Sequence, residues 1–236
     1  MKKMLIPAVF IISLILISCG KSYDESMADG EEFVTAKSYQ EALESFDNAI
    51  DKAESAAQSI AAKINAGNLS STYLKDMEKA NSYYQATLDD VSDYSSADLR
   101  DLAKQALTAQ ANQAAVSMYK LLLEKYSDNA DILDIKYELA EVYHKNLRDL
   151  RSAIDTYNKI FIDYPDSEQA PKALFSIGYI YANELGENES ATDYYSQFLK
   201  NYPDHEMAPS VEFELKYLGK ALEEIPELQH LLTKTS

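Results

Sequence analysis

Few side chains in this sequence have the type and spacing that catalysis or metal binding requires. There is one cysteine and there are three histidines, His144, His205 and His230, and no two of these lie at a spacing typical of a metal site. The chain has no glycine-rich phosphate loop and no Gly-x-Ser-x-Gly motif. Carboxylates are numerous, but runs such as Glu223-Glu224 are typical of a solvated surface. We therefore predict no catalytic residue, no metal site, no cofactor and no small-molecule substrate, so that the protein is not an enzyme.

The single cysteine, Cys19, stands at the end of an apolar stretch. Lys2 and Lys3 precede the mostly apolar run 4–17, which is shorter than the about 20 residues needed to cross a membrane. The run ends in Leu-Ile-Ser-Cys-Gly, which resembles the lipobox of bacterial lipoproteins. This resemblance implies a signal peptide at 1–18 and lipidation of Cys19 with acyl chains such as palmitate. The alternatives are a buried or stray cysteine, or an uncleaved anchor.

The residues after Cys19 bear on where such an anchor would place the protein. Gly20 rather than Asp follows the cysteine, which in enteric bacteria directs a lipoprotein to the outer membrane. We expect the lipidated cysteine and a short linker at 19–24. Such a linker would hold the first helix within roughly 20 Å of the lipid, since an extended residue spans at most about 3.5 Å. The expected location is the cell envelope, at the outer membrane and facing the periplasm.

A pattern of small and aromatic residues returns at a nearly constant interval along the rest of the chain. The pair Ala153 and Tyr157, followed by Tyr-Pro-Asp, returns 38 residues later as Ala191 and Tyr195, again followed by Tyr-Pro-Asp. Earlier pairs, separated by intervals of 38, 35 and 38 residues, are Ala42 with Phe46, Ala80 with Tyr84, and Ala115 with Tyr119. A fixed period of this length is typical of a stacked repeat protein.

The repeat unit resembles the tetratricopeptide repeat (TPR), a helical hairpin. In Leu174-x2-Ile177-Gly178-x2-Tyr181, the glycine would let two backbones approach while the larger side chains fill the seam. Glycine and proline are few, six of each, which favours helix. We predict an all-α fold, an α-α superhelix of the TPR-like solenoid type, with about five hairpins and a C-terminal capping helix. The residues expected to pack between its helices are Ala153, Tyr157, Leu174, Ile177, Gly178, Tyr181, Ala191 and Tyr195.

The two halves of the array differ in clarity. Degenerate TPR-like repeats are expected at 25–129, TPR repeats and the capping helix at 130–225, and a tail at 226–236. The segment 53–96 is least clear, with turns indicated at 67–71 and 92–96; it is either a degenerate second repeat or a long helical excursion that breaks the array. The last helix is expected from Pro209 to about Glu224.

In TPR proteins the first helices of successive hairpins line a concave groove. The repeat register places aromatic and hydrogen-bonding side chains there, which suits capture of a helix or an extended peptide. The alternative is that these aromatics belong to the core. The candidate groove residues are Tyr137, Glu141 and His144, then Phe175, Tyr179 and Asn183, and finally Phe213 and Tyr217.

The formal charge of −17 limits the possible partners. Such a surface repels nucleic acid and anionic lipid headgroups, so we predict no nucleic-acid partner. A solvated acidic exterior and a surface for a basic partner both remain open.

A lipobox followed closely by about five TPR-like hairpins resembles the BamD (YfiO-like) family of outer-membrane assembly lipoproteins. The pattern Tyr-Pro-Asp-Ser…Ala-Pro…Ala-Leu at 164–174 also resembles the CpoB (YbgF-like) family of periplasmic division coordinators. These resemblances imply a lipid-anchored scaffold that binds other envelope proteins, in outer-membrane protein assembly. The alternative is a structural spacer, or a coordinator of envelope and division complexes, without a peptide groove.

Overall fold

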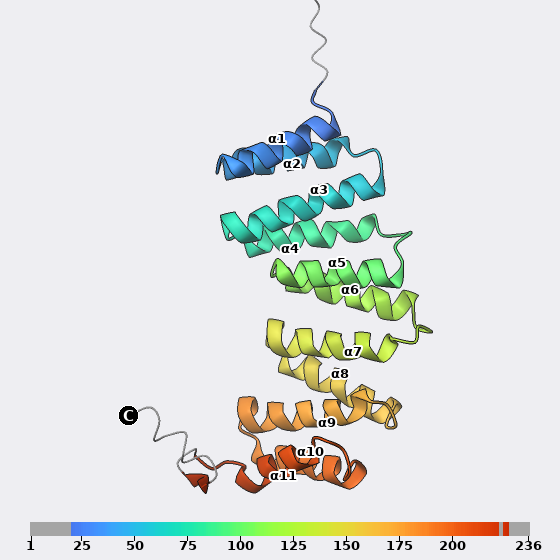
Figure 1. Ribbon diagram of the computed structural model, residues 1–236, viewed down its shortest axis with the longest axis vertical. Helices are drawn as coiled ribbons and strands as arrows, with labels where there is room; N and C mark the ends of the chain where they lie inside the picture. Colours follow the sequence, from blue (N-terminus) through green and yellow to red (C-terminus); the bar gives the residue numbers. More distant parts are fainter. Residues whose placement is uncertain (1–19, 222–223, 227–236) are drawn as a thin grey trace, which may run out of the picture.

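The computed structural model describes residues 20–221 and 224–226. The expected signal peptide at 1–18, the lipidation site Cys19 and residues 227–236 of the expected tail lie outside the described residues. Within the described part every regular element is helical, and the helices stack one on another as five hairpins and a final helix (Figure 1). The predicted superhelix of about five hairpins with a C-terminal capping helix is confirmed. The elements are α1 (Tyr23–Thr35) with α2 (Tyr39–Lys52), α3 (Ala56–Leu69) with α4 (Met77–Ala86), α5 (Ser96–Thr108) with α6 (Asn112–Lys125), α7 (Ile132–Glu141) with α8 (Leu150–Asp163), α9 (Gln169–Ile180) with α10 (Asn188–Asn201), and α11 (Ala208–Tyr217).

Close contact between a small residue and an aromatic ring joins the two helices of several hairpins. A Cβ atom added at Gly178 in α9 would lie 2.5 Å from the Tyr195 ring in α10, so no larger residue fits there without a shift. The ring itself is fully buried. The glycine–aromatic pairs of this kind are Gly30 with Phe46, Gly67 with Tyr84, and Gly178 with Tyr195.

The turn inside each hairpin repeats with the sequence period. One residue per turn adopts a left-handed conformation, with φ between 57° and 69°, and these residues are 38, 35, 38 and 38 positions apart. A residue with a Cβ atom is strained there by roughly 1–2 kcal/mol, and only the last of the five is a glycine. Short π-helical segments, η1 (Ser70–Leu74), η3 (Val142–Leu147) and η4 (Tyr181–Leu185), lead into three of the turns. The left-handed residues are Lys37, Lys75, Gln110, Arg148 and Gly186.

The unclear segment 53–96 forms a second helical hairpin, α3 with α4, within the stack. The turn expected at 67–71 is wrong, because Gly67 lies inside α3 and η1 carries the helix on to Leu74. The glycine serves the close contact with Tyr84 instead of a turn. The turn expected at 92–96 does lie between elements, since α5 begins at Ser96.

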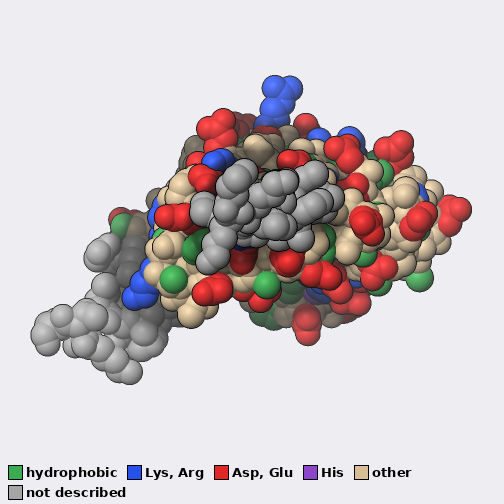
Figure 2. All heavy atoms as spheres, turned by 90° about the horizontal axis from the view of Figure 1, so that it is seen from above, with side chains coloured by type: hydrophobic (Ala, Val, Ile, Leu, Met, Phe, Trp, Pro, Cys, Tyr) green, Lys and Arg blue, Asp and Glu red, His purple; other side chains and the backbone are tan. Residues whose placement is uncertain are grey.

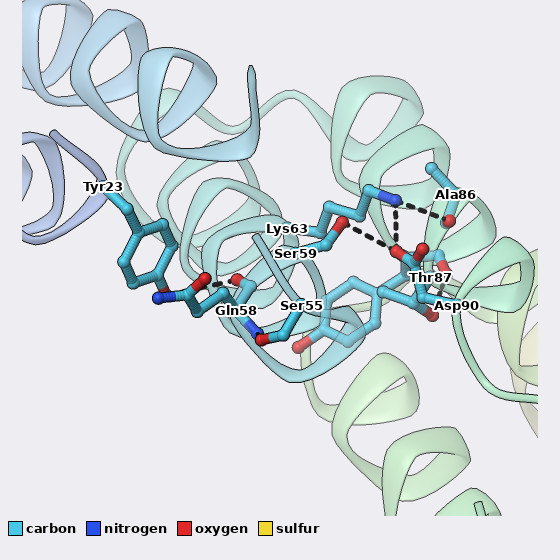
Figure 3. Close-up of polar contacts among 9 residues, drawn as sticks. Tyr23, Ser55, Gln58, Ser59, Lys63, Ala86, Thr87 and Asp90 are labelled. Carbon is cyan, nitrogen blue, oxygen red and sulfur yellow. Dashed lines mark hydrogen bonds and ion pairs between the residues drawn. The ribbon is translucent and has the colours of Figure 1, made fainter. Parts of the chain in front are cut away.

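A cluster of polar contacts holds the end of this second hairpin (Figure 3). Lys63 of α3 donates from Nζ to Oδ2 of Asp90 at 2.7 Å and to the carbonyl oxygen of Ala86 at 3.0 Å. Ser59, one turn earlier, donates to the same Asp90 oxygen at 2.7 Å. α3 is thereby tied to the last residue of α4 and to Asp90, which lie on either side of the 3-10 turn η2 (Thr87–Asp89). α4 also packs against α6 of the next hairpin. Asn81 of α4 accepts a hydrogen bond from the backbone N–H of Ala114 in the first turn of α6.

Two expected boundaries differ from the structure. α1 begins at Tyr23 and not after residue 24, because Ser22 and Glu25 form a capping box at its start. α11 ends at Tyr217 and not near Glu224, because Gly219 follows with a φ of 74°. No helix in the described ranges has the length and apolar character needed to span a bilayer.

Candidate binding groove

The fourth and fifth hairpins enclose a cavity of about 440 Å³, mainly between α7 and α9, which we call the α7–α9 groove. It brings together five of the eight residues expected to line a groove, because α7 and α9 are neighbouring first helices in the stack. The other lining side chains are Lys145, Tyr157, Lys172, Ser176 and Met207. The five expected residues are Tyr137, Glu141, His144, Phe175 and Tyr179.

Aromatic rings form the apolar part of the α7–α9 groove. Tyr157 of α8 is fully buried and lies 5.2 Å from Tyr137, measured between ring centroids. The ring centroid of Phe175 lies 6.1 Å from that of Tyr195 and 6.4 Å from that of Tyr179. Tyr179 is 40% exposed. The wall therefore offers a partly exposed aromatic face held by rings behind it.

The polar side chains of the groove are ordered by ion pairs. His144 is buried, and its Nε2 lies against the carboxylate of Glu184, which also pairs with Arg148 at 2.6 Å. Lys145 pairs with Glu141 one turn before it, and this hydrogen bond raises the pKa of the lysine. His144 therefore links the ends of α7 and α9 and is not free to act as an exposed ligand. The sequence pattern missed Glu184, because the equivalent position one repeat earlier is Asn146.

Three of the expected groove residues lie elsewhere. Asn183, Phe213 and Tyr217 line a separate, smaller cavity at the C-terminal end of the stack, together with Ile225. The Asn183 side chain donates to the carbonyl oxygen of Tyr179, and the rings of Phe213 and Tyr217 lie 4.9 Å apart. These residues thus occupy equivalent repeat positions, but the α7–α9 groove does not extend along the array to α11.

Seven of the eight residues expected to pack between helices are buried, and Tyr181 is half-buried. Tyr181 stacks on Tyr194 with a centroid distance of 5.5 Å and an angle of 15°, at the edge of the seam. The buried seven are Ala153, Tyr157, Leu174, Ile177, Gly178, Ala191 and Tyr195. Among the described residues, no group of three or more His, Cys, Asp or Glu side chains is placed to hold a metal ion.

The region around the α7–α9 groove matches a known family. Residues 134–167 and 172–205 match the family model of the tetratricopeptide repeat, and these ranges cover most of the fourth and fifth hairpins. These two hairpins are therefore tetratricopeptide repeats by sequence. This class of helical scaffold is suited to protein–protein interaction.

The similar solved structures include TPR proteins and the protein MamA. YrrB, described as a TPR protein with an unusual peptide-binding site, shares 16% identity over 80% of this chain and 91% of its own, with a TM-score of 0.43. A TPR protein from Parabacteroides merdae shares 17% identity over 84% of this chain and 73% of its own, with a TM-score of 0.41. MamA shares 18% identity over 86% of this chain and 98% of its own, with a TM-score of 0.40. Likeness at this level is no guide to partners. No curated protein sequence matches the chain.

Proposed function

We propose that this protein is a lipid-anchored scaffold of the bacterial cell envelope that binds a segment of another protein in the α7–α9 groove. The observation that carries the binding role is the cavity of about 440 Å³ with Tyr179 40% exposed in its wall. Exposed aromatics in a preformed cavity are typical anchors of protein interfaces. The polar groups of the groove, Glu141 and Lys145 among them, can pair with the backbone or charged side chains of a bound segment.

The proposed anchor is Cys19, and its support comes from the sequence. Residues 16–20 resemble a lipobox, and the capping box at Ser22 leaves only Gly20 and Lys21 between the cysteine and the cap of α1. At no more than about 3.5 Å per residue, such a connection would hold α1 within roughly 10–15 Å of the lipid. Placement at the outer membrane, facing the periplasm, and a role in outer-membrane protein assembly rest on the resemblance to the BamD family.

Site-specific photocrosslinking tests the groove. A photoreactive phenylalanine analogue at Tyr179 should trap a protein partner in cells, and Tyr137→Ala in the same chain should weaken that adduct because it removes a neighbouring groove wall. The matched control carries the analogue at Gln197, which is exposed on α10 and does not line the cavity. Equal adducts at both positions, or none at Tyr179, would contradict the groove.

Fractionation tests the anchor separately. Cys19→Ser should move the protein from the membrane fraction to the soluble fraction and abolish incorporation of labelled palmitate. A Cys19→Ser protein that stays with the membrane would show that something other than lipid on this residue attaches it.

A structural spacer without a peptide groove is the second candidate, favoured by one observation. Ile162 on α8 is 62% exposed and lies outside the α7–α9 groove, so it offers an apolar contact on another surface. If that surface mediates assembly, Ile162→Glu should disrupt a co-purifying complex while Tyr179→Glu leaves it intact. The opposite result favours the groove.

A further inference from the structure

We propose that the first three hairpins form a second binding groove, which takes an extended, basic segment of a partner protein. The groove is a cavity of about 520 Å³ lined by residues of α1, α2, α3, η1 and α5, and we call it the N-terminal groove. It shares no lining residue with the α7–α9 groove. The inference therefore stands or falls independently of the function proposed above.

The floor of the N-terminal groove is apolar and its wall is an exposed aromatic ring. Phe46 and Leu69 are each only 3% exposed, and Val34 is half-buried beside them. Tyr73 is 48% exposed, yet its ring is fixed by stacking on Tyr39 at a centroid distance of 4.6 Å and an angle of 17°. A large ring that is exposed and already held in place binds an apolar side chain at small cost in conformational entropy.

Two carboxamides on neighbouring turns of α3 give the groove its hydrogen-bonding character. Asn65 and Asn68 both line the cavity. The hydroxyl of the buried Tyr84 donates to Oδ1 of Asn68 at 2.9 Å, which orients the amide and leaves its N–H groups for a ligand. Carboxamides both donate and accept, and so they match the alternating N–H and C=O groups of an extended backbone. This arrangement favours a peptide in extended form.

The charge of the groove selects a basic segment. Among the described residues, Glu31 is the only charged one that lines it, whereas the α7–α9 groove is lined by Lys145 and Lys172 as well as Glu141. α1 carries five carboxylates and no lysine or arginine between Tyr23 and Thr35. A view onto the N-terminal end shows more acidic than basic side chains there (Figure 2). A lysine or arginine in the bound segment would therefore meet a complementary field.

An ion-pair bridge lies between the parts of the stack that form the two grooves. Arg100 of α5 donates from Nε and Nη2 to the two carboxylate oxygens of Glu138 in α7, at 3.0 and 2.7 Å. Its Nη1 donates to Asp131 at 2.9 Å. Such a two-pronged pair fixes the spacing of α5 and α7. The two grooves can therefore hold two different segments at a fixed separation.

Fluorescence anisotropy with two labelled peptides tests the proposal on the full chain in detergent. The probe is Gly-Lys-Val-Phe-Lys-Leu-Lys-Gly, and its control has glutamate in place of each lysine. We expect the basic probe to bind about tenfold or more tightly than the acidic one, with an affinity that falls as salt is added. Glu31→Lys should weaken binding by about tenfold or more, and Tyr73→Ala should weaken it as well. Glu32→Lys is the matched control, because Glu32 is exposed on the same helix but does not line the cavity.

Each outcome decides the matter. Clearly greater weakening by Glu31→Lys than by Glu32→Lys, with binding unchanged in Tyr179→Ala, supports the N-terminal groove. Equal binding of the two peptides, equal loss in both charge-reversal variants, or no binding of the basic probe overturns it. Loss on Tyr179→Ala alone would assign the peptide to the α7–α9 groove instead. Circular dichroism of each variant confirms that both exposed substitutions leave the helices folded.

Discussion

The second helices of four hairpins each bury a tyrosine at an equivalent position. Burial raises the pKa of Tyr84 to about 12, and it raises the pKa of the other three as well. The hydroxyls have different surroundings: that of Tyr84 meets Asn68, whereas that of Tyr195 is buried with no hydrogen-bond partner among the described residues. What these positions share is therefore the ring, which fills the hairpin, while the surroundings of the hydroxyl differ from one hairpin to the next. The four tyrosines are Tyr84, Tyr119, Tyr157 and Tyr195.

The ring of Tyr157 should account for much of the stability of the fourth hairpin. Tyr157→Ala is expected to lower the free energy of unfolding by about 3–5 kcal/mol, because it removes a fully buried ring and leaves a cavity. Tyr157→Phe keeps the ring and should lower the free energy of unfolding by only about 1 kcal/mol. Urea unfolding followed by circular dichroism measures both, and an unchanged midpoint for Tyr157→Ala would falsify the packing assigned to this ring.

The glycine contact in the fifth hairpin allows a paired test. Gly178→Ala should lower the free energy of unfolding by about 1–3 kcal/mol, because the new methyl group meets the Tyr195 ring. Gly186→Ala is the control: nothing lies within 4 Å of its Cβ position, and only the strain of a φ of 69° remains, about 1 kcal/mol. Thermal unfolding compares them. A larger effect at Gly186 would mean that the hairpin adjusts to the methyl group.

At the scale of elements, the second hairpin differs from the others in how it ends. α4 is only 10 residues long, and Lys63 of α3 reaches across to hold the carbonyl of Ala86 and the carboxylate of Asp90. The Lys63 side chain is 12% exposed and that of Asp90 24%, so the pair is shielded in part from solvent. This contact compensates for a short helix and an irregular connection to α5.

Removal of the Asp90 carboxylate should therefore weaken the N-terminal half of the array. Asp90→Ala is expected to lower the free energy of unfolding by about 1–3 kcal/mol, since it leaves a largely buried ammonium group with one partner fewer. Asp89→Ala, at an exposed neighbouring residue, should change it by no more than about 0.5 kcal/mol. Chemical unfolding of the two variants side by side measures the difference, and equal effects would contradict the role of the Lys63–Asp90 ion pair.

The ion pair between Lys63 and Asp90 also predicts that the stability of the fold falls in acid. Burial alone would raise the pKa of Asp90, but hydrogen bonds from Lys63 and Ser59 outweigh it, and the pKa is lowered. A lowered pKa in the folded state means that the carboxylate stabilises the fold above its ordinary pKa of about 3.9 and that this contribution is lost as the pH falls through the folded value. The stability difference between the native chain and Asp90→Asn should be full at neutral pH and vanish in strong acid. A difference that persists in acid would rule out the charge as its cause.

On the scale of the whole molecule, the hairpins form an array in which each unit contacts its neighbours. The buried tyrosines run through this array from the second hairpin to the fifth. Because the neutral phenol is the form that the fold accommodates, loss of its proton opposes folding throughout the stack. The net charge of −17 adds further repulsion once tyrosinates form.

The array should therefore unfold in alkali. A pKa raised in the folded state gives stability that is present below the unfolded value of about 10 and is lost as the pH rises toward the folded value, about 12 for Tyr84. Tyrosinate absorbance and circular dichroism during a titration should show the buried tyrosines ionising above pH 10, together with loss of helix. Ionisation of all tyrosines in one step near pH 10, with the helices intact, would contradict their burial.

The repeat period and the helical class could be predicted because both are local properties. Alanine and an aromatic residue four positions apart lie on the same face of a helix, whatever the rest of the fold. Five copies of this pair therefore indicated five hairpins. The start of α1 was also local, since Ser22 and Glu25 form a capping box, but the expectation placed it later. The end of α11 was expected too late, because Gly219 stops the helix in a left-handed conformation before Glu224.

Composition and spacing alone determined that this protein is a stack of helical hairpins with an acidic surface. The tertiary structure decided which side chains meet: it joined Tyr137 and His144 to Tyr179, separated Phe213 from them, and turned His144 toward Glu184. It also revealed the N-terminal groove. The reason is physical, because contacts between hairpins depend on how far each unit is rotated and shifted against the next. That offset is the sum of many packing contacts and is not encoded in any one repeat.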